Sequence, residues 1–262
     1  MDFVQTEEQQ MVRQTIREFA ESELAPGAAE RDEKEEFPAE GVKKLGELGF
    51  FGVTVPEENG GAGLDMISYA IAVEELARVD ASTAIVISVT NSLVCYPLEK
   101  FASDEQKEKF LKPLASGEKL GAFSLTEPGS GSDAGDMKTT AVRDGDDYIL
   151  NGTKNFITSG KSCDLMLVFV VTDKSKGSKG TSGFIVEKGM PGFEVGKKES
   201  KLGIRASDTV SVSFENCRVP AANRIGDEGM GFKIALTALN SGRIGVAAQA
   251  LGIAQGAFEE AV

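Results

Sequence analysis

The spacing of apolar residues changes twice along this 262-residue chain. From Thr6 to about Gly117 the apolar side chains recur with the period of a helix, and from Leu120 to about Arg218 they follow a period of two. A glycine-rich link at residues 226–231 then leads into a second helical stretch, which continues to Val262. This order predicts an α+β protein with a helical domain over residues 1–119, a middle antiparallel β-sandwich or barrel domain over residues 120–224, and the first helix of a helical bundle over residues 225–262.

The helical part carries clear start signals. Thr6 with Gln9 and Ser103 with Gln106 both fit the capping-box pattern at a helix N-terminus. Asp80 is placed to cap a helix that is nearly all apolar over residues 84–94. A helix that is apolar on all sides belongs in a core or against a ligand cavity. No apolar stretch approaches membrane-spanning length, so no membrane insertion is expected.

The middle part contains short runs that are typical of strands, bounded by turn residues. Asp144-Gly145-Asp146 predicts a hairpin turn, and residues 173–181 form a Lys/Ser/Gly-rich surface loop. The predicted strands cover residues 148–150, 165–171, 183–186 and 210–214.

One segment of the middle part has a composition suited to ligand binding. In residues 122–133 a short apolar strand runs into Thr-Glu-Pro-Gly and then into a Gly/Ser loop. Glycines let a backbone approach a flat or anionic ligand closely, although a single cluster of this kind is more often a surface turn. Two further segments, residues 152–160 (GTKNFITSG) and residues 201–209 (KLGIRASDT), follow in fixed order. Three such segments in order indicate function more strongly than one.

Together these segments resemble the acyl-CoA dehydrogenase family, flavoenzymes that desaturate acyl-CoA thioesters between the α and β carbons. The resemblance runs along the whole chain, from residues 7–9 (EEQ) through residues 56–61 (PEENGG) to residues 245–252 (GVAAQALG). The last of these and residues 196–199 (GKKE) are most similar to the short-chain, butyryl-CoA branch. Family members continue well beyond Val262, so the resemblance implies that most of a third, helical domain lies outside these residues.

The resemblance implies an FAD cofactor held against the β domain. Hydrogen bonds to the pyrimidine edge of the flavin stabilise the negative charge that appears there on reduction. Thr158 corresponds to the hydroxyl at the flavin N5, and Phe156 stands where many relatives have Trp. Gly131 and Ser132 correspond to contacts with the pyrophosphate. The implied cofactor-binding residues are Phe123, Leu125, Thr126, Gly131, Ser132, Phe156, Ile157 and Thr158.

The resemblance also implies an acyl-CoA track. Arg243 suits a nucleotide or phosphate contact, with an arginine on a solvated helix face as the alternative. Asn240 replaces an Asp that many relatives carry. The acyl end is expected near residues 84–94, where the absence of an arginine around Ala84 favours a short apolar acyl group over a dicarboxylate. The implied substrate-binding residues are Ser132, Ser178, Asn240, Ser241, Gly242 and Arg243.

No catalytic base is expected among these residues. Removing the α-proton needs a carboxylate in a dry pocket, and most of the family carries this Glu in the third domain. A minority branch carries it on the helix that follows the β domain, where this sequence has Gly242. The 262-residue chain is therefore expected to hold FAD poorly and to turn over slowly or not at all.

Charge and composition exclude several classes of function for this chain. A net charge of −13 argues against a nucleic-acid partner. The absence of histidine and the presence of only three scattered cysteines suggest neither a metal site nor a disulfide framework. The family resemblance implies an electron-transferring flavoprotein as partner, a homotetramer for the longer form, and a cytoplasmic location in a bacterium or the mitochondrial matrix in a eukaryote. The alternatives are a dehydrogenase for branched or alicyclic acyl-CoA, an acyl-CoA oxidase, and a non-catalytic interaction module.

Overall fold

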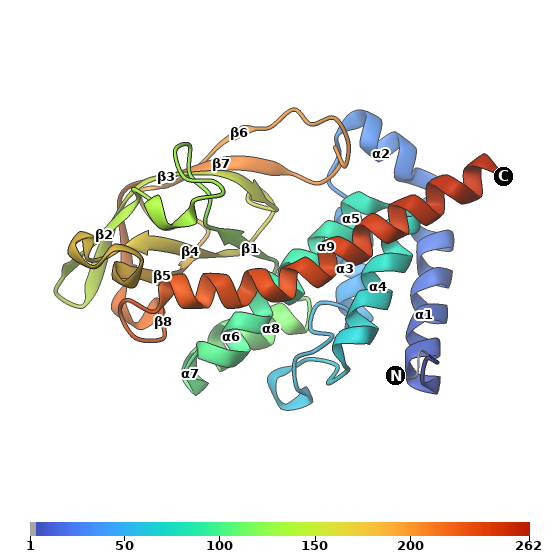
Figure 1. The fold of residues 1–262 in the computed structure, drawn as a ribbon, viewed down its shortest axis with the longest axis horizontal. Coiled ribbons are helices and arrows are strands. Elements are labelled where there is room, and N and C mark those ends of the chain that lie inside the picture. The colour runs from blue at the N-terminus through green and yellow to red at the C-terminus, as the bar shows by residue number, and fades with distance from the viewer. Residues whose placement is uncertain (1–3) are drawn as a thin grey trace.

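The computed structural model describes residues 4–262, which form a helical half and a sheet half joined by one long helix (Figure 1). Both capping boxes predicted from the sequence are present, at Thr6 with Gln9 and at Ser103 with Gln106. The helices of the first half are α1 (Glu7–Phe19), α2 (Ala28–Lys34), α3 (Ala39–Glu47), α4 (Met66–Val79), α5 (Ala81–Ser88), α6 (Tyr96–Phe101), α7 (Asp104–Gln106) and α8 (Lys112–Ala115).

The central apolar helix of this half is longer than predicted from the sequence. Asp80 caps it by accepting hydrogen bonds from the amides of Ser82 and Thr83. A π-helical segment, η4 (Val89–Cys95), joins α5 to α6, so that the helix runs over Ala81–Phe101. These 21 residues are long and apolar enough to cross a membrane, which corrects the expectation that no such stretch exists. In the most apolar window, 78% of the residues are buried inside the fold, as in a core helix.

In the described part of the chain, eight strands form one mixed sheet in the order β6-β7-β3-β2-β4-β5-β8, with β1 paired to β4. Most neighbours are antiparallel, as predicted, but β1 and β2 pair with β4 in parallel. The predicted turn at Gly145 joins β2 to β3. The strands are β1 (Gly121–Ser124), β2 (Thr140–Asp144), β3 (Asp147–Thr158), β4 (Leu165–Val171), β5 (Thr181–Glu187), β6 (Phe193–Lys198), β7 (Thr209–Pro220) and β8 (Arg224–Ile225).

β4 explains why the sheet half has two cores. Alternate side chains of a strand point to opposite faces, and every residue of β4 is buried. Leu165, Leu167 and Phe169 pack with residues of η4, α6 and the start of α9, whereas Met166 and Val168 pack against β3 and β7. A continuous apolar run is the pattern expected of a strand that is covered on both sides.

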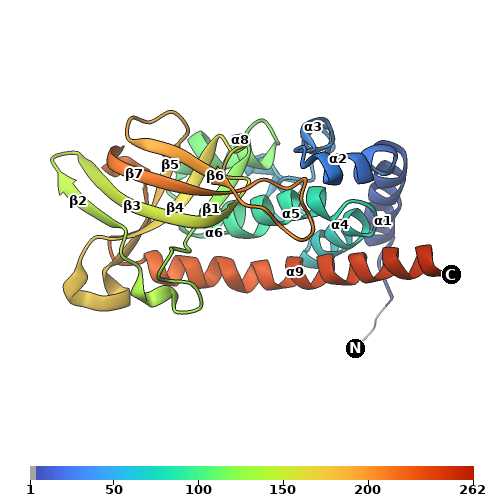
Figure 2. The ribbon, with the colours of Figure 1, turned by 90° about the horizontal axis from the view of Figure 1, so that it is seen from above.

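The last helix, α9 (Gly231–Ala261), connects the two halves. It starts beside β5 and runs along α4 to the far end of the helical half (Figures 1 and 2). Glycines allow close contact with α4, since a Cβ at Gly252 would lie 2.2 Å from the carbonyl oxygen of Glu74. One face of α9 therefore packs against the helical half while its start contacts the sheet.

Candidate functional site

A small cavity lies where the ends of β1 and β3 meet η4 and α9. Its volume is about 160 Å³, below the roughly 300 Å³ at which typical ligand pockets begin. It has room for part of a planar ring and not for a whole dinucleotide. Six of the eight predicted cofactor residues line it, together with three residues of η4 and α9: Phe123, Leu125, Thr126, Phe156, Ile157, Thr158, Val89, Leu93 and Leu239.

A β-bulge in β3 determines which side chains reach this cavity. The pairing of β3 with β7 shifts by one residue between Lys154 and Ile157. Phe156 lies in the bulge with φ of 59°, a left-handed conformation that is rare for an aromatic residue. Lys154 and Ile157 are both buried, whereas Phe156 is 61% exposed. The bulge thus reverses the alternation of the strand and leaves Phe156 available at the cavity rim.

The loop after β1 is hydrogen-bonded to the bulged part of β3. The amide of Asn155 donates to the carbonyl oxygen of Thr126 at 2.8 Å. Within residues 4–262, the Thr126 amide and the hydroxyls of Thr126 and Thr158 have no protein hydrogen-bond partner. These polar groups at the cavity are consequently free to bind a ligand that carries acceptors along one edge.

A second, larger cavity of about 490 Å³ adjoins the first along η4 and α9. The two cavities share Val89, Leu93 and Leu239. Part of its lining, from Ile85 to Leu93, lies in the stretch of residues 84–94 near which the acyl end is expected. In the described part of the chain, no Asp or Glu lines either cavity. The larger cavity is lined by Ile85, Ser88, Val89, Ser92, Leu93, Leu239, Gly242, Arg243, Val246, Ala247 and Ala250.

Only part of the predicted substrate segment reaches this cavity. Gly242 and Arg243 line it. Ser241 is buried and lines neither cavity, and Asn240 is exposed. The Arg243 guanidinium donates to the Asn240 side-chain oxygen at 3.0 Å, so this arginine has a partner within its own helix.

Gly131, Ser132 and Ser178 lie apart from both cavities. All three are exposed. Ser132 precedes a 3-10 turn at Ala134–Asp136, which contacts the 3-10 segment Lys174–Gly180 that contains Ser178. The structure therefore brings the loops of Ser132 and Ser178 together on the surface, which is compatible with one extended ligand track.

Three residues that line the cavities, Val89, Leu93 and Leu239, were not predicted individually from the sequence. Val89 and Leu93 lie within the apolar stretch near which the acyl end is expected, but periodicity alone could not show which of these residues face the cavities. Leu239 precedes the predicted segment 240–243 by one residue, and only the crossing of α9 over η4 brings it into contact with both spaces.

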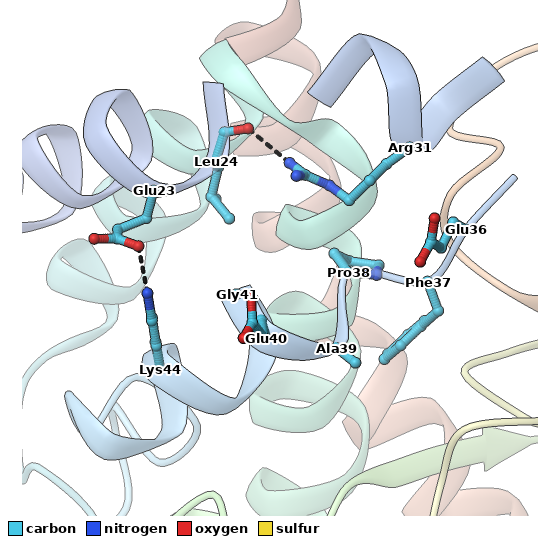
Figure 3. Close-up of a pocket in the computed structure, with 10 residues that line it drawn as sticks. All are labelled: Glu23, Leu24, Arg31, Glu36, Phe37, Pro38, Ala39, Glu40, Gly41 and Lys44. Atoms are coloured by element: carbon cyan, nitrogen blue, oxygen red, sulfur yellow. Dashed lines mark hydrogen bonds and ion pairs between the residues drawn. The ribbon is translucent and has the colours of Figure 1, made fainter. Parts of the chain in front are cut away.

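A polar cavity in the helical half is remote from these residues (Figure 3). It lies between α3 and residues 23–38. Arg31 donates to the carbonyl oxygen of Leu24 at 2.7 Å, and Lys44 pairs with Glu23 at 2.5 Å. These cationic groups are already engaged within the protein, so the cavity offers little to a ligand.

Comparison with known proteins agrees with this architecture. The chain matches the acyl-CoA dehydrogenase N-terminal domain over residues 6–118, the middle domain over residues 122–217 and the C-terminal domain over residues 229–262. It is 54% identical over 261 residues to the short-chain specific acyl-CoA dehydrogenase of Clostridium acetobutylicum, covering 100% of this chain and 69% of that protein. This chain belongs to the acyl-CoA dehydrogenase family.

Two solved structures are similar throughout. Butyryl-CoA dehydrogenase from Megasphaera elsdenii is 49% identical with a TM-score of 0.97, over 100% of this chain and 69% of that one. Glutaryl-CoA dehydrogenase from Mycobacterium smegmatis in complex with FADH2 is 35% identical with a TM-score of 0.90, over 97% of this chain and 64% of that one. The chain spans 62% of the length of mammalian mitochondrial short-chain relatives. The fold class predicted from sequence is confirmed.

Proposed function

We propose that this chain is the flavin- and acyl-binding portion of an FAD-dependent dehydrogenase for short-chain acyl-CoA thioesters. The observation that carries the proposal is the adjacency of two cavities, one with unpartnered polar groups at its rim and one lined almost wholly by apolar side chains. A redox-active ring in the first would lie directly beside an acyl chain in the second. Such contact is what hydride transfer requires.

The residues at the smaller cavity fit the edge of a flavin. The Thr126 amide and the two threonine hydroxyls supply donors, and Phe156 supplies an exposed aromatic ring. Bound there, FAD would accept the β-hydride of the thioester. Gly131 and Ser132 would extend the binding track along the surface toward the pyrophosphate.

The substrate residues are proposed on the same basis. Ile85, Val89 and Leu93 would contact a short apolar acyl group, and Arg243, which also lines the cavity, already has Asn240 as a partner. Ser178 and Asn240 would contact the CoA portion, and Gly242 and Arg243 would form the cavity wall, with the buried Ser241 next to them in the chain. Removal of the α-proton needs a carboxylate. We propose that this carboxylate belongs to the region that the longer relatives have in addition to the part matched by this chain.

The surroundings of the reaction follow from the same proposal. Electrons would pass to an electron-transferring flavoprotein, and the longer form would assemble as a homotetramer. The site would operate in the bacterial cytoplasm or, in a eukaryote, in the mitochondrial matrix.

The direct test is the visible spectrum of the purified chain with excess FAD, recorded before and after anaerobic addition of butyryl-CoA. We expect FAD in excess to bind weakly, in line with the expectation that the chain holds FAD poorly, and to remain oxidised. Bleaching of the flavin band would show that the base lies within these residues. Failure to bind any FAD would contradict the flavin assignment.

A carboxylate placed on the wall of the larger cavity is expected to change that outcome. A Cβ at Gly242 would lie 2.7 Å from the Cδ2 methyl of Leu93, the tip of a flexible side chain beside open space. Gly242→Glu should allow butyryl-CoA to reduce bound FAD at least about 10²-fold faster than Gly242→Gln, since general-base catalysis contributes that much or more. The glutamine variant has the same shape and no base. Equal rates for the two variants would contradict the placement of the acyl group.

Replacing Phe156 should separate flavin contact from stability. Phe156→Gly removes a largely exposed ring from a position whose backbone is left-handed, a conformation that glycine adopts easily. The free energy of unfolding should therefore change by no more than about 1 kcal/mol. FAD affinity should fall about fivefold, which corresponds to one aromatic contact. Fluorescence titration and urea denaturation measure the two quantities. Phe258→Ala, which removes an equally exposed ring on α9, should leave FAD affinity unchanged.

A further inference from the structure

A buried ion pair lies directly behind the smaller cavity. Lys154 of β3 is 0% exposed and Glu127 is 5% exposed. The Lys154 ammonium group donates to Glu127 Oε1 at 2.8 Å and to the carbonyl oxygen of Leu125 at 3.0 Å. Neither side chain lines either cavity, so both are outside the contact set described above.

Glu127 extends these contacts into a network across three segments. Its two carboxylate oxygens accept the amides of Lys138 at 2.5 Å and of Thr139 at 3.0 Å. The loop after β1, the two residues before β2 and the bulged part of β3 are thereby joined at one buried carboxylate. A network in which each buried member is hydrogen-bonded rigidifies the backbone around it.

The bond to Leu125 determines the direction of the next amide. In a planar trans peptide the carbonyl oxygen of one residue and the N–H of the following residue point in opposite directions. Because the Leu125 carbonyl points at buried Lys154, the Thr126 N–H points away from it. Within residues 4–262 that N–H has no protein acceptor, and Thr126 lines the cavity.

The same side chain supports the strained part of β3. Lys154 and Asn155 bind the carbonyl oxygens of Leu125 and Thr126 in turn, immediately before the left-handed Phe156. A residue persists in such a conformation only when its surroundings over-determine it. The two bonds provide that constraint on one side of the bulge.

We propose that Lys154 is a positioning residue for the flavin: it holds the Leu125–Thr126 peptide so that the Thr126 N–H is presented to the ring. This inference rests on the proposed function and adds to it a residue that does not contact the ligand. Preorganisation of this kind increases affinity because the binding group does not have to be ordered when the ligand arrives.

The first test uses the unaltered protein. Hydrogen exchange of the Thr126 amide, followed by NMR, should slow at least about tenfold when FAD is added, because an amide that gains an acceptor is protected. FAD binding without protection of this amide would overturn the inference while leaving the flavin assignment intact. Absence of any FAD binding would overturn both.

The second test compares variants that differ in the bond to Leu125. Lys154→Met combined with Glu127→Gln removes the donor and leaves no unpaired charge. Glu127→Gln alone keeps the donor and one acceptor oxygen, and one of the two amides of Lys138 and Thr139 loses its acceptor in both variants alike. We expect FAD affinity to fall at least about tenfold in the double variant and to stay within about threefold of the unaltered protein in Glu127→Gln.

A remote ion pair controls for general loss of charge. Lys107 and Glu99 pair at 3.2 Å in the helical half, and Lys107→Met with Glu99→Gln should leave FAD affinity unchanged. Urea denaturation of each FAD-free variant shows whether it is folded. A folded Lys154→Met, Glu127→Gln protein that binds FAD as the unaltered protein does, with the same visible spectrum, would show that Lys154 is only structural.

Discussion

Lys154→Met alone is expected to lower the free energy of unfolding by about 3–5 kcal/mol, the usual cost of removing one partner from a buried ion pair. The variant leaves the Glu127 carboxylate buried with two amide donors and no cation. Burial would raise the pKa of Glu127, but the Lys154 ammonium and the amide donors hold it below its ordinary value. Urea denaturation at pH 7 measures the change.

The double variant with Glu127→Gln provides the control for this prediction. It should recover most of the lost stability, because a neutral pair has no buried charge left without a partner. If the single and double variants were equally unstable, packing of the lysine stem would be responsible and not its charge.

The stability contributed by Lys154 should also depend on pH. Burial lowers the pKa of Lys154 to about 8, against the raising effect of Glu127, whereas an unfolded lysine titrates near pH ~10.4. Between these values the unfolded chain binds more protons, so this residue makes stability rise with pH. The difference in unfolding free energy between the unaltered protein and Lys154→Met should grow by about 2 kcal/mol from pH ~7.5 to ~9.5. Taking the difference between the two proteins cancels the contribution of cysteine titration, because both contain the same three cysteines.

Gly252→Val is expected to destabilise the protein by about 3 kcal/mol, at the upper end of the usual cost of overpacking. A Cβ at this position would lie 2.2 Å from the carbonyl oxygen of Glu74 and 3.0 Å from the amide nitrogen of Arg78. Both are backbone atoms of α4 and cannot rotate away, so α9 must move off α4.

Ala254→Val is the matched control for that substitution. Ala254 lies two residues further along α9 on its exposed side, and valine there changes only helix propensity, by about 0.5 kcal/mol. Chemical denaturation gives the stability of both variants, and hydrogen exchange shows whether α9 separates from α4. Equal stability of the two variants would mean that α4 can yield at this contact.

The sequence predicted the elements whose signals are local. The capping residues Thr6 and Ser103, the turn at Gly145 and the apolar strand over residues 165–171 all depend on neighbours within a few positions. The bulge at Phe156 was not predicted, since it arises from the pairing of β3 with β7 and has no signal of its own. The strand β6 was missed because its side chains are mostly exposed and show no clear alternation.

The site was predictable only as a set of segments. Thr126, Phe156 and Thr158 lie in residues 122–133 and 152–160, which the family resemblance singled out, and the structure brings them to one cavity. Lys154 lies in the second segment and was passed over, because a lysine within a strand is usually solvent-exposed. Only its burial against Glu127 distinguishes it from the surface lysines nearby.

The bulge at Phe156 has a counterpart further down the same pair of strands. β7 contains one extra residue near Asn216, which is also left-handed with φ of 49°, and β3 contains one extra residue at the bulge. The two offsets cancel, so Thr158 pairs with Thr209 in the same register in which Leu150 pairs with Cys217. The lengths of the two strands are therefore coupled: a chain that loses one residue near Phe156 can keep its cavity end in register only by losing one near Asn216 as well.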